Sequence, residues 1–190
     1  FGTDSIDKIP SGTYLSPDPE KVAYFAKRLG KKTKKRVGIV WSGGYRPDQP
    51  EVWAVNERRN IALEKLIPLQ HPDIEFFSLQ LGEPAVTELA NSKDWDCLNN
   101  LTHELKDFDD TAALIENLDL VIAVDTSTAH LAGAIGKPVW LMNRFDTCWR
   151  WLMDRSDSPW YPTFTIYRQP KLGDWDSVIE AIRKDLHKDL

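Results

Sequence analysis

The chain of 190 residues lacks most of the signals that mark membrane, metal-binding and secreted proteins. Its two cysteines, Cys97 and Cys148, lie too far apart for a metal or redox motif, which favours a reducing, cytoplasmic setting. No run is long and apolar enough to span a membrane, and the N-terminus has no signal-peptide pattern. The chain begins with Phe1 rather than Met, which indicates a fragment or a processed form.

Several catalytic signatures are also missing. There is no G-x-G-x-x-G or Walker loop, so a dehydrogenase and a P-loop enzyme are disfavoured. The sequence has neither a nucleophile elbow nor a suitably spaced pair of carboxylates, so nothing in it indicates a hydrolase. The formal net charge of -5 argues against binding nucleic acid, and the basic run at residues 31–36 is best interpreted as a solvated approach to a strand.

What is present is an alternation of strand and helix patterns. Such an alternation predicts an α/β fold, a Rossmann-like doubly wound parallel sheet, with residues 1–18 as a linker or arm and 19–190 as a single domain. A long loop is expected at 42–60 and a Trp-rich loop at 143–162. The predicted strands are 37–41, 74–79, 97–101, 120–124, 139–142 and 164–167, and the predicted helices are 19–29, 61–69, 83–91, 109–117, 126–135 and 175–190.

Residues 118–142 are the most informative stretch. A buried strand ends there in Asp125-Thr-Ser-Thr128, a helix with small residues follows, and Gly136 with Pro138 ends it before the next strand. Free backbone N–H groups and the dipole at a helix start favour a phosphate or carboxylate. Thr126, Ser127 and Thr128 are therefore candidate anion-binding residues. His130 lies one turn on, either as a ligand-binding or as a structural histidine.

Three other segments are expected at the same carboxyl edge of the sheet. Ser42, Gly43 and Gly44 follow the first strand, where paired glycines suit either close approach to a ligand or a plain turn. Arg59 precedes a helix, either to clamp a phosphate or as part of a charged helix start. Asp107 lies at the start of the helix before the strand at 120–124, with capping as its simplest role. The aromatic residues Trp149, Trp151, Trp160 and Tyr161 suit stacking on a sugar or base, or an apolar contact.

These motifs resemble a known family. Residues 125–140 (Asp-Thr-Ser-Thr-Ala-His-Leu-Ala-Gly-Ala-Ile-Gly-Lys-Pro-Val-Trp), with residues 149–152, 158–162 and 167–169, are similar to the C-terminal glycosyltransferase region of bacterial tetratricopeptide-repeat proteins. That region is related to the lipopolysaccharide heptosyltransferases and, more distantly, to O-linked N-acetylglucosamine transferases. Residues 37–43, 78–80 and 107–113 also fit, and the resemblance runs from about Pro10 to the end.

The resemblance implies the donor-binding, C-terminal half of a two-domain GT-B glycosyltransferase of hexosyl or heptosyl type. Its substrate would be a UDP-, ADP- or GDP-sugar, with no metal and no further cofactor. The residues that it implies around the diphosphate are Ser42, Gly43, Gly44, Thr126, Ser127 and Thr128. His130 and Arg59 would be catalytic, with His130 stabilising the leaving group, and Gln80, Asp107 and Asp125 would bind the nucleotide.

Two departures and two alternatives accompany this interpretation. The loop from Tyr45 to Val55 is longer than usual, and Arg59-Asn60 replaces the usual Arg-Ser. The resemblance implies that an N-terminal half outside this chain holds the acceptor, a glycan or a protein, and the catalytic base, so the chain alone is expected to be inactive. The alternatives are a non-catalytic sugar-nucleotide-binding or interaction module and a nucleotide-sugar epimerase.

Overall fold

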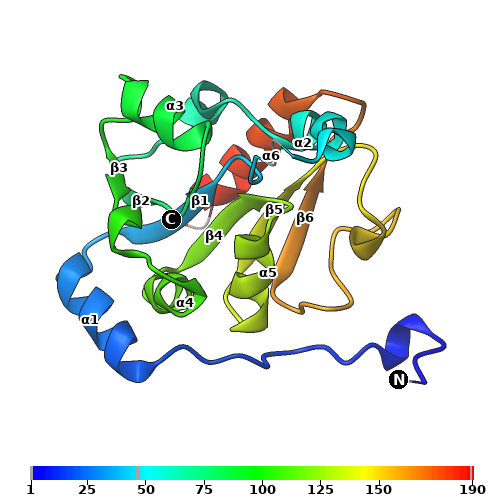
Figure 1. The fold of residues 1–190 in the computed structure, drawn as a ribbon, viewed down its shortest axis with the longest axis horizontal. Coiled ribbons are helices and arrows are strands. Elements are labelled where there is room, and N and C mark those ends of the chain that lie inside the picture. Colours follow the sequence, from blue (N-terminus) through cyan, green and yellow to red (C-terminus); the bar gives the residue numbers. More distant parts are fainter. Residues whose placement is uncertain (1, 46–47, 189) are drawn as a thin grey trace.

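Six parallel strands form one sheet with helices on both faces, in a computed structural model that describes residues 2–45, 48–188 and 190 (Figure 1). The strand order is β3-β2-β1-β4-β5-β6, and every pairing is parallel. The predicted Rossmann-like, doubly wound α/β sheet is therefore confirmed. The strands are β1 Lys35–Val40, β2 Ile74–Ser78, β3 Leu98–Asn100, β4 Leu120–Val124, β5 Val139–Asn143 and β6 Phe164–Arg168.

The helices agree with the sequence pattern in most places. The α-helices are α1 Pro19–Leu29, α2 Trp53–Arg59, α3 Ala85–Asn91, α4 Phe108–Glu116, α5 Ser127–Ala134 and α6 Trp175–Lys188. The 3-10 helices are η1 Ile6–Lys8, η2 Pro50–Val52, η3 Leu63–Leu69, η4 Thr102–Glu104 and η5 Trp149–Trp151.

The prediction of one long loop over residues 42–60 is wrong, because η2 and α2 occupy its second half. Pro50 stands at the first position of η2, where its fixed φ suits a helix start and its missing N–H costs nothing. The following Ala54, Arg58 and Arg59 are good helix formers. The glycines of residues 42–60 therefore belong to the first half of the segment, and Pro50 belongs to the start of the helical second half.

The helix predicted at residues 61–69 is a 3-10 helix, η3, rather than an α-helix. Pro68 lies inside it and would break an α-helical ladder. Its buried residues Leu63, Leu66 and Leu69 are three apart, and this spacing lines up on one face of a 3-10 helix with three residues per turn. The apolar spacing therefore matches the tighter helix.

Two hydrophobic cores lie on opposite faces of the sheet, since side chains along a strand alternate between faces. Val121 and Ala123 of β4 point into the core with α1, α4 and α5. Ile122 and Val124 of the same strand point into the core with η3 and α6. Burial on both faces explains why β4 is continuously apolar.

Helix α5 packs unusually close to the aromatic rings beside it, and Gly133 makes this possible. A Cβ at Gly133 would lie 2.6 Å from Phe164 Cε1 and 2.7 Å from Tyr161 Cδ1. Gly133→Ala is therefore expected to lower the free energy of unfolding by about 1–2 kcal/mol, although alanine is the better helix former. Urea unfolding measures this change.

Phe164→Leu provides the matched control for Gly133→Ala, since it makes space where the added methyl would lie. The double variant should lose less stability than the sum of the two single variants. A Gly133→Ala protein that is more stable than the wild type would contradict this packing.

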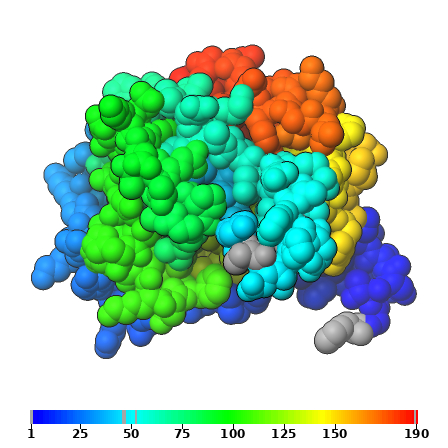
Figure 2. All heavy atoms as spheres, turned by 45° about the horizontal axis from the view of Figure 1, so that its top comes forward, coloured from blue at the N-terminus to red at the C-terminus, as the bar shows by residue number. Residues whose placement is uncertain are grey.

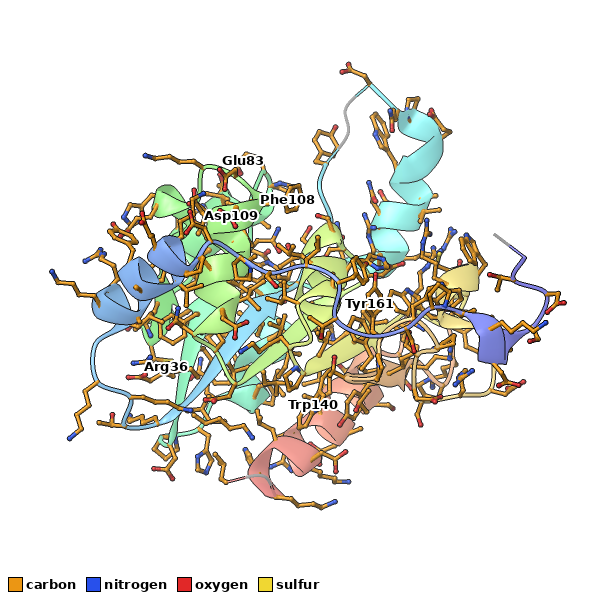
Figure 3. All side chains as sticks on the ribbon, turned by 90° about the horizontal axis from the view of Figure 1, so that it is seen from below. Arg36, Glu83, Phe108, Asp109, Trp140 and Tyr161 are labelled. Carbon is orange, nitrogen blue, oxygen red and sulfur yellow. The ribbon has the colours of Figure 1, made fainter. Side chains whose placement is uncertain are left out.

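The predicted arm, described from Gly2 onward, runs along the end of α5. The backbone N–H groups of Tyr14 and Leu15 both donate to the Ala134 carbonyl, at 2.9 and 3.1 Å. The Tyr14 hydroxyl lies 3.3 Å from that of Tyr161, on the side of the molecule where Figure 3 shows the arm crossing. The role of residues 1–18 as an interdomain linker stays a prediction. Among the helices described, none has the length and apolar character needed to span a bilayer.

Candidate anion-binding site

The carboxyl ends of β1 and β4 lie side by side at the point where the strand order reverses. Open α/β sheets bind ligands at such a switch point. Figure 2 turns this edge of the sheet forward and shows α2, in cyan, lying on it between the green α3–α4 region and the yellow η5 segment. The segments that follow β1 and β4, together with the end of α2, form the candidate site.

The start of α5 is open. Thr126 is its N-cap, but no side-chain hydrogen bond caps the helix, and the Thr126 hydroxyl donates instead to the Val124 carbonyl at 3.2 Å. Threonine is a common capping residue, but here its hydroxyl is turned away from the helix. Ser127 is exposed and Thr128 is nearly buried, at 9% exposure. The first N–H groups of α5 are thus available to an anion.

Arg59 joins the two strand ends. Its Nη1 donates to the Asp125 carbonyl at 2.8 Å, and its Nη2 donates to the Asn56 side chain. The guanidinium also covers Gly43, where a Cβ would lie only 2.0 Å from Nη2. Gly43 is needed because any side chain would displace this arginine. The structure thus brings the predicted residues Gly43, Arg59 and Asp125 together.

The glycine loop after β1 is held by amide side chains. The Gly43 N–H donates to Asn60 Oδ1 at 2.8 Å, and the Asn56 side chain donates to the Gly44 carbonyl at 3.5 Å. The Ser42 hydroxyl donates to the Gly43 carbonyl at 3.2 Å. Because the loop is positioned by its own protein contacts, its backbone is organised before any ligand arrives.

The Gln80 side chain, which is 3% exposed, also holds this loop in place. Its Oε1 accepts the N–H groups of Trp41 and Ser42, at 3.2 and 3.0 Å. Its predicted contact with a nucleotide is untested. Arg46 of the same predicted loop, and Pro47, lie outside the described residues.

His130 is fixed from three directions. Its Nδ1 lies 3.0 Å from the Tyr161 hydroxyl and its Nε2 lies 3.7 Å from Asp125 Oδ1. Its ring stacks on that of the fully buried Trp151, with centroids 5.1 Å apart. The aromatic residues of the Trp-rich loop thus differ in their surroundings. Trp151 and Tyr161 contact His130, whereas Trp149 is 67% exposed.

The protonation of these groups follows from their surroundings. Burial alone raises the pKa of the Asp125 carboxyl, but contacts with the His130 imidazole and the Trp151 indole, and the charge of Arg59, outweigh it and hold the pKa below its usual value. Burial, and then the hydrogen bond with Tyr14, raise the pKa of Tyr161. Asp125 is thus anionic and Tyr161 neutral around neutral pH.

The lowered pKa of Asp125 predicts a pH-dependent contribution to stability. A depressed carboxyl pKa stabilises the folded chain above the ordinary value of 3.8, and this contribution is lost as pH falls through the folded-state pKa. Asp125→Asn should therefore lower the free energy of unfolding near pH 7, with the difference from wild type shrinking at pH 3. Urea unfolding at both pH values measures it, with the exposed Asp7→Asn as control; a difference that grows in acid would contradict the assignment.

Asp107 lies farther along the same edge, as the N-cap of α4. Its Oδ1 accepts the Asp110 N–H at 2.8 Å, and its carboxylate pairs with Lys21 at 3.1 Å. The Asp110 N–H and then Lys21 lower the pKa of Asp107. Capping, the simplest of its predicted roles, is confirmed. A cavity of about 270 Å³ adjoins it, lined by Leu81, Leu105, Lys106, Asp107, Phe108 and Thr111.

The sequence interpretation missed the residues that position the site. The sequence pattern assigns no role to Asn56 and Asn60, which hold Arg59 and Gly43, and it does not predict the ion pair between Arg58 and Asp146 at 2.9 Å. A helix prediction starting at Pro50 would place Asn56, Arg59 and Asn60 on one face, because they are spaced i, i+3 and i+4. Among the described residues, no cluster of His, Cys, Asp or Glu side chains is arranged to hold a metal ion.

Comparison with solved structures shows that this chain has a fold found in glycosyltransferases. The ADP-heptose lipopolysaccharide heptosyltransferase II of E. coli aligns with a TM-score of 0.56 at 14% identity, over 92% of this chain and 54% of that one. A glycosyl transferase family 9 protein of Veillonella parvula aligns with a TM-score of 0.58 at 12% identity, over 94% of this chain and 55% of that one. At these identities the likeness establishes the fold.

Among curated proteins, Protein FlbA of Caulobacter vibrioides is 30% identical over 175 residues, which are 89% of this chain and 28% of FlbA. No family model matches the chain. The chain therefore spans about half the length of the two solved glycosyltransferases and little more than a quarter of FlbA.

Proposed function

We propose that this chain binds the donor of a glycosyltransferase, a nucleotide diphosphate sugar, and stabilises the leaving diphosphate without a metal ion. The observation that carries the proposal is the meeting of Arg59, Gly43 and the uncapped start of α5 at the switch point of a sheet shared with glycosyltransferases. Backbone N–H groups and a guanidinium are suited to a phosphate.

The chemistry follows from charge development. As the bond between the sugar and the diphosphate breaks, negative charge grows on the leaving phosphate oxygens. The N–H groups of α5, the hydroxyls of Ser127 and Thr128, Arg59 and His130 would meet that charge, because preorganised donors are worth most where charge develops. Asp125, held anionic, orients the imidazole from 3.7 Å.

We propose a site for the nucleoside on the same edge of the sheet. The cavity beside Asp107 is lined by Leu81 and Phe108, which are 47% and 61% exposed, and a base would cover these apolar side chains. We place the nucleoside there, with the diphosphate running from it toward the start of α5.

The remaining parts of the proposed reaction lie outside this chain. An N-terminal half would hold the acceptor, a glycan or a protein, and the group that activates it, and tetratricopeptide repeats would accompany it. The type of sugar, hexose or heptose, and the cytoplasmic setting are part of the proposal. Nucleic acid is not a proposed partner.

Titration calorimetry on the intact protein tests donor binding. UDP, ADP and GDP, the matching monophosphates and the corresponding nucleotide sugars form the panel, each with and without EDTA. We expect the nucleotides of one base to bind equally well with and without EDTA. Arg59→Ala should weaken their affinity at least about tenfold. Failure of all these compounds to bind the intact protein would refute the proposal.

One observation favours a second candidate function, an interaction module. Trp149, Met153 and Phe145 near η5 are 67%, 60% and 45% exposed, which is an apolar surface suited to a protein contact. The nucleotide panel separates the two, since an interaction module would bind none of its members.

A further inference from the structure

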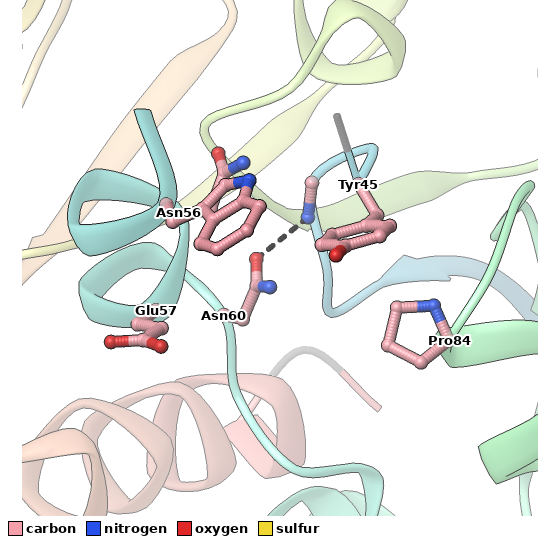
Figure 4. A pocket seen from close by; sticks show the side chains of 7 residues that line it. Tyr45, Asn56, Glu57, Asn60 and Pro84 are labelled. Atoms are coloured by element: carbon pink, nitrogen blue, oxygen red, sulfur yellow. Dashed lines mark hydrogen bonds between the residues drawn. The ribbon is translucent and has the colours of Figure 1, made fainter. Parts of the chain in front are cut away.

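A second cavity adjoins the glycine loop formed by residues 42–44. It has a volume of about 300 Å³ and lies between the segment after β1, helix α2 and the segment after β2 (Figure 4). This volume is at the lower end of the range for small-molecule sites. Its lining residues are Gly43, Tyr45, Trp53, Asn56, Glu57, Asn60 and Pro84.

Two aromatic rings form one wall of this cavity. Tyr45 and Trp53 stack on each other with centroids 6.1 Å apart and planes 27° apart, so the apolar surface that the pair offers to a ligand is its outer faces and ring edges. They are 54% and 40% exposed, and Pro84 lies near Tyr45 in Figure 4. Large rings with a polar tip give contact area at low cost in entropy and commonly bind ligands that are part apolar and part polar.

Polar groups line the other side. Asn60 Oδ1 accepts the Gly43 N–H at 2.8 Å, which leaves its Nδ2 as the end that can donate to a ligand. Asn56 adds a second amide, and Glu57 adds an exposed carboxylate. A carboxylate accepts hydroxyl hydrogen bonds and repels phosphate, so the lining suits a neutral ligand rich in hydroxyl groups.

The position of the cavity also indicates which kind of ligand it would bind. Gly43 belongs both to the lining of this cavity and to the loop covered by Arg59. A ligand here would therefore lie next to a diphosphate bound at α5. In a nucleotide sugar one end of the diphosphate carries the nucleoside and the other end carries the sugar. The acceptor must approach the sugar carbon that is bonded to the diphosphate.

We propose that the cavity between Tyr45, Trp53 and Asn60 is a saccharide subsite, which binds one sugar ring beside the diphosphate. This inference rests on the proposed donor site and adds to it. A sugar ring presents C–H groups on its faces and hydroxyls at its rim, which match the Tyr45–Trp53 wall and the amide and carboxylate side. The ring belongs either to the donor sugar or to the acceptor.

The test measures binding by the intact protein and four variants. The variants are Trp53→Ala, Tyr45→Ala, the ring-retaining Trp53→Phe, and Tyr24→Ala as a matched control, because Tyr24 is 51% exposed but lies on α1. Calorimetry uses UDP, ADP and GDP and their glucose and N-acetylglucosamine conjugates. Saturation-transfer NMR uses the free methyl glycosides of the same sugars, and circular dichroism checks folding.

We expect Trp53→Ala and Tyr45→Ala to weaken binding of a sugar-bearing probe about five- to tenfold, with Trp53→Phe largely restoring it. Loss confined to the nucleotide sugar assigns the cavity to the donor, and loss confined to the free glycoside assigns it to the acceptor. Unchanged affinity for both, or an equal loss for the bare nucleotide, overturns the subsite.

The same measurements separate this inference from the donor proposal. If no nucleotide binds the wild type, the donor proposal fails, and the free glycosides still test the cavity. If nucleotides bind and the two aromatic variants match Tyr24→Ala with every sugar-bearing probe, only the saccharide subsite fails.

Discussion

His130→Ala in the intact protein is expected to lower sugar transfer about 100- to 1,000-fold, the range seen when one preorganised donor to a developing anion is removed. The imidazole lies at the open start of α5, 3.7 Å from Asp125 Oδ1, with its Nδ1 3.0 Å from the Tyr161 hydroxyl. Because the role proposed for His130 is to stabilise charge that grows during bond breaking, the turnover rate should fall more than the nucleotide affinity. Steady-state kinetics with the donor identified by calorimetry give both quantities.

His103→Ala is the matched control, since His103 is 70% exposed at its side chain and lies in η4. Tyr161→Phe keeps the ring and removes the hydroxyl, so it should reduce turnover less than His130→Ala. Turnover and nucleotide affinity that both stay at wild-type values in His130→Ala would remove His130 from the site.

Gly43→Ala should weaken nucleotide binding at least about tenfold while the fold is retained, because loss of a charged hydrogen-bonding partner costs more than 1.4 kcal/mol. The added Cβ would lie 2.0 Å from Arg59 Nη2 and 2.4 Å from Cζ, so the guanidinium must move away from the Asp125 carbonyl. Gly44→Ala should have a smaller effect, since no heavy atom of the described residues, apart from those of its chain neighbours, lies within 4 Å of its added Cβ. Calorimetry and urea unfolding measure affinity and stability.

A double-variant cycle shows whether Gly43 acts through Arg59. If it does, Gly43→Ala adds almost nothing to the loss in Arg59→Ala, because the displaced group is already gone. Additive losses would show that the added methyl group blocks the ligand directly, and the role assigned here to Gly43 would then be wrong.

The strand–helix junction at residues 118–142 shows how far sequence reasoning reaches. Strand β4 matches the predicted bounds, and the helix differs by one residue at each end, with Thr126 and Ile135 as its caps. These elements are local: a continuous apolar run, a polar cap segment and a Gly-x-Pro stop need no distant partner. The hydroxyl of Thr126 was the exception, since it donates back to Val124 and not into the helix.

The segment after β1 shows the opposite case. Its glycines and prolines indicated a loop, yet η2 and α2 form there, and α2 is held by contacts with distant residues. Arg59 donates to Asp125, 66 positions away in the chain, and Arg58 pairs with Asp146. No local pattern contains such partners.

By itself, the sequence determined the parallel α/β sheet, because periodicity is a property of consecutive residues, and it predicted a ligand site at the carboxyl edge and anion binding at residues 125–128 from the pattern of a helix start. Only the tertiary structure decided that Arg59 covers Gly43, that Tyr161 and Trp151 fix His130, and that Tyr45 and Trp53 form a wall of a cavity with Asn60. These contacts join residues far apart in the chain, and their existence depends on how the strands are ordered in the sheet.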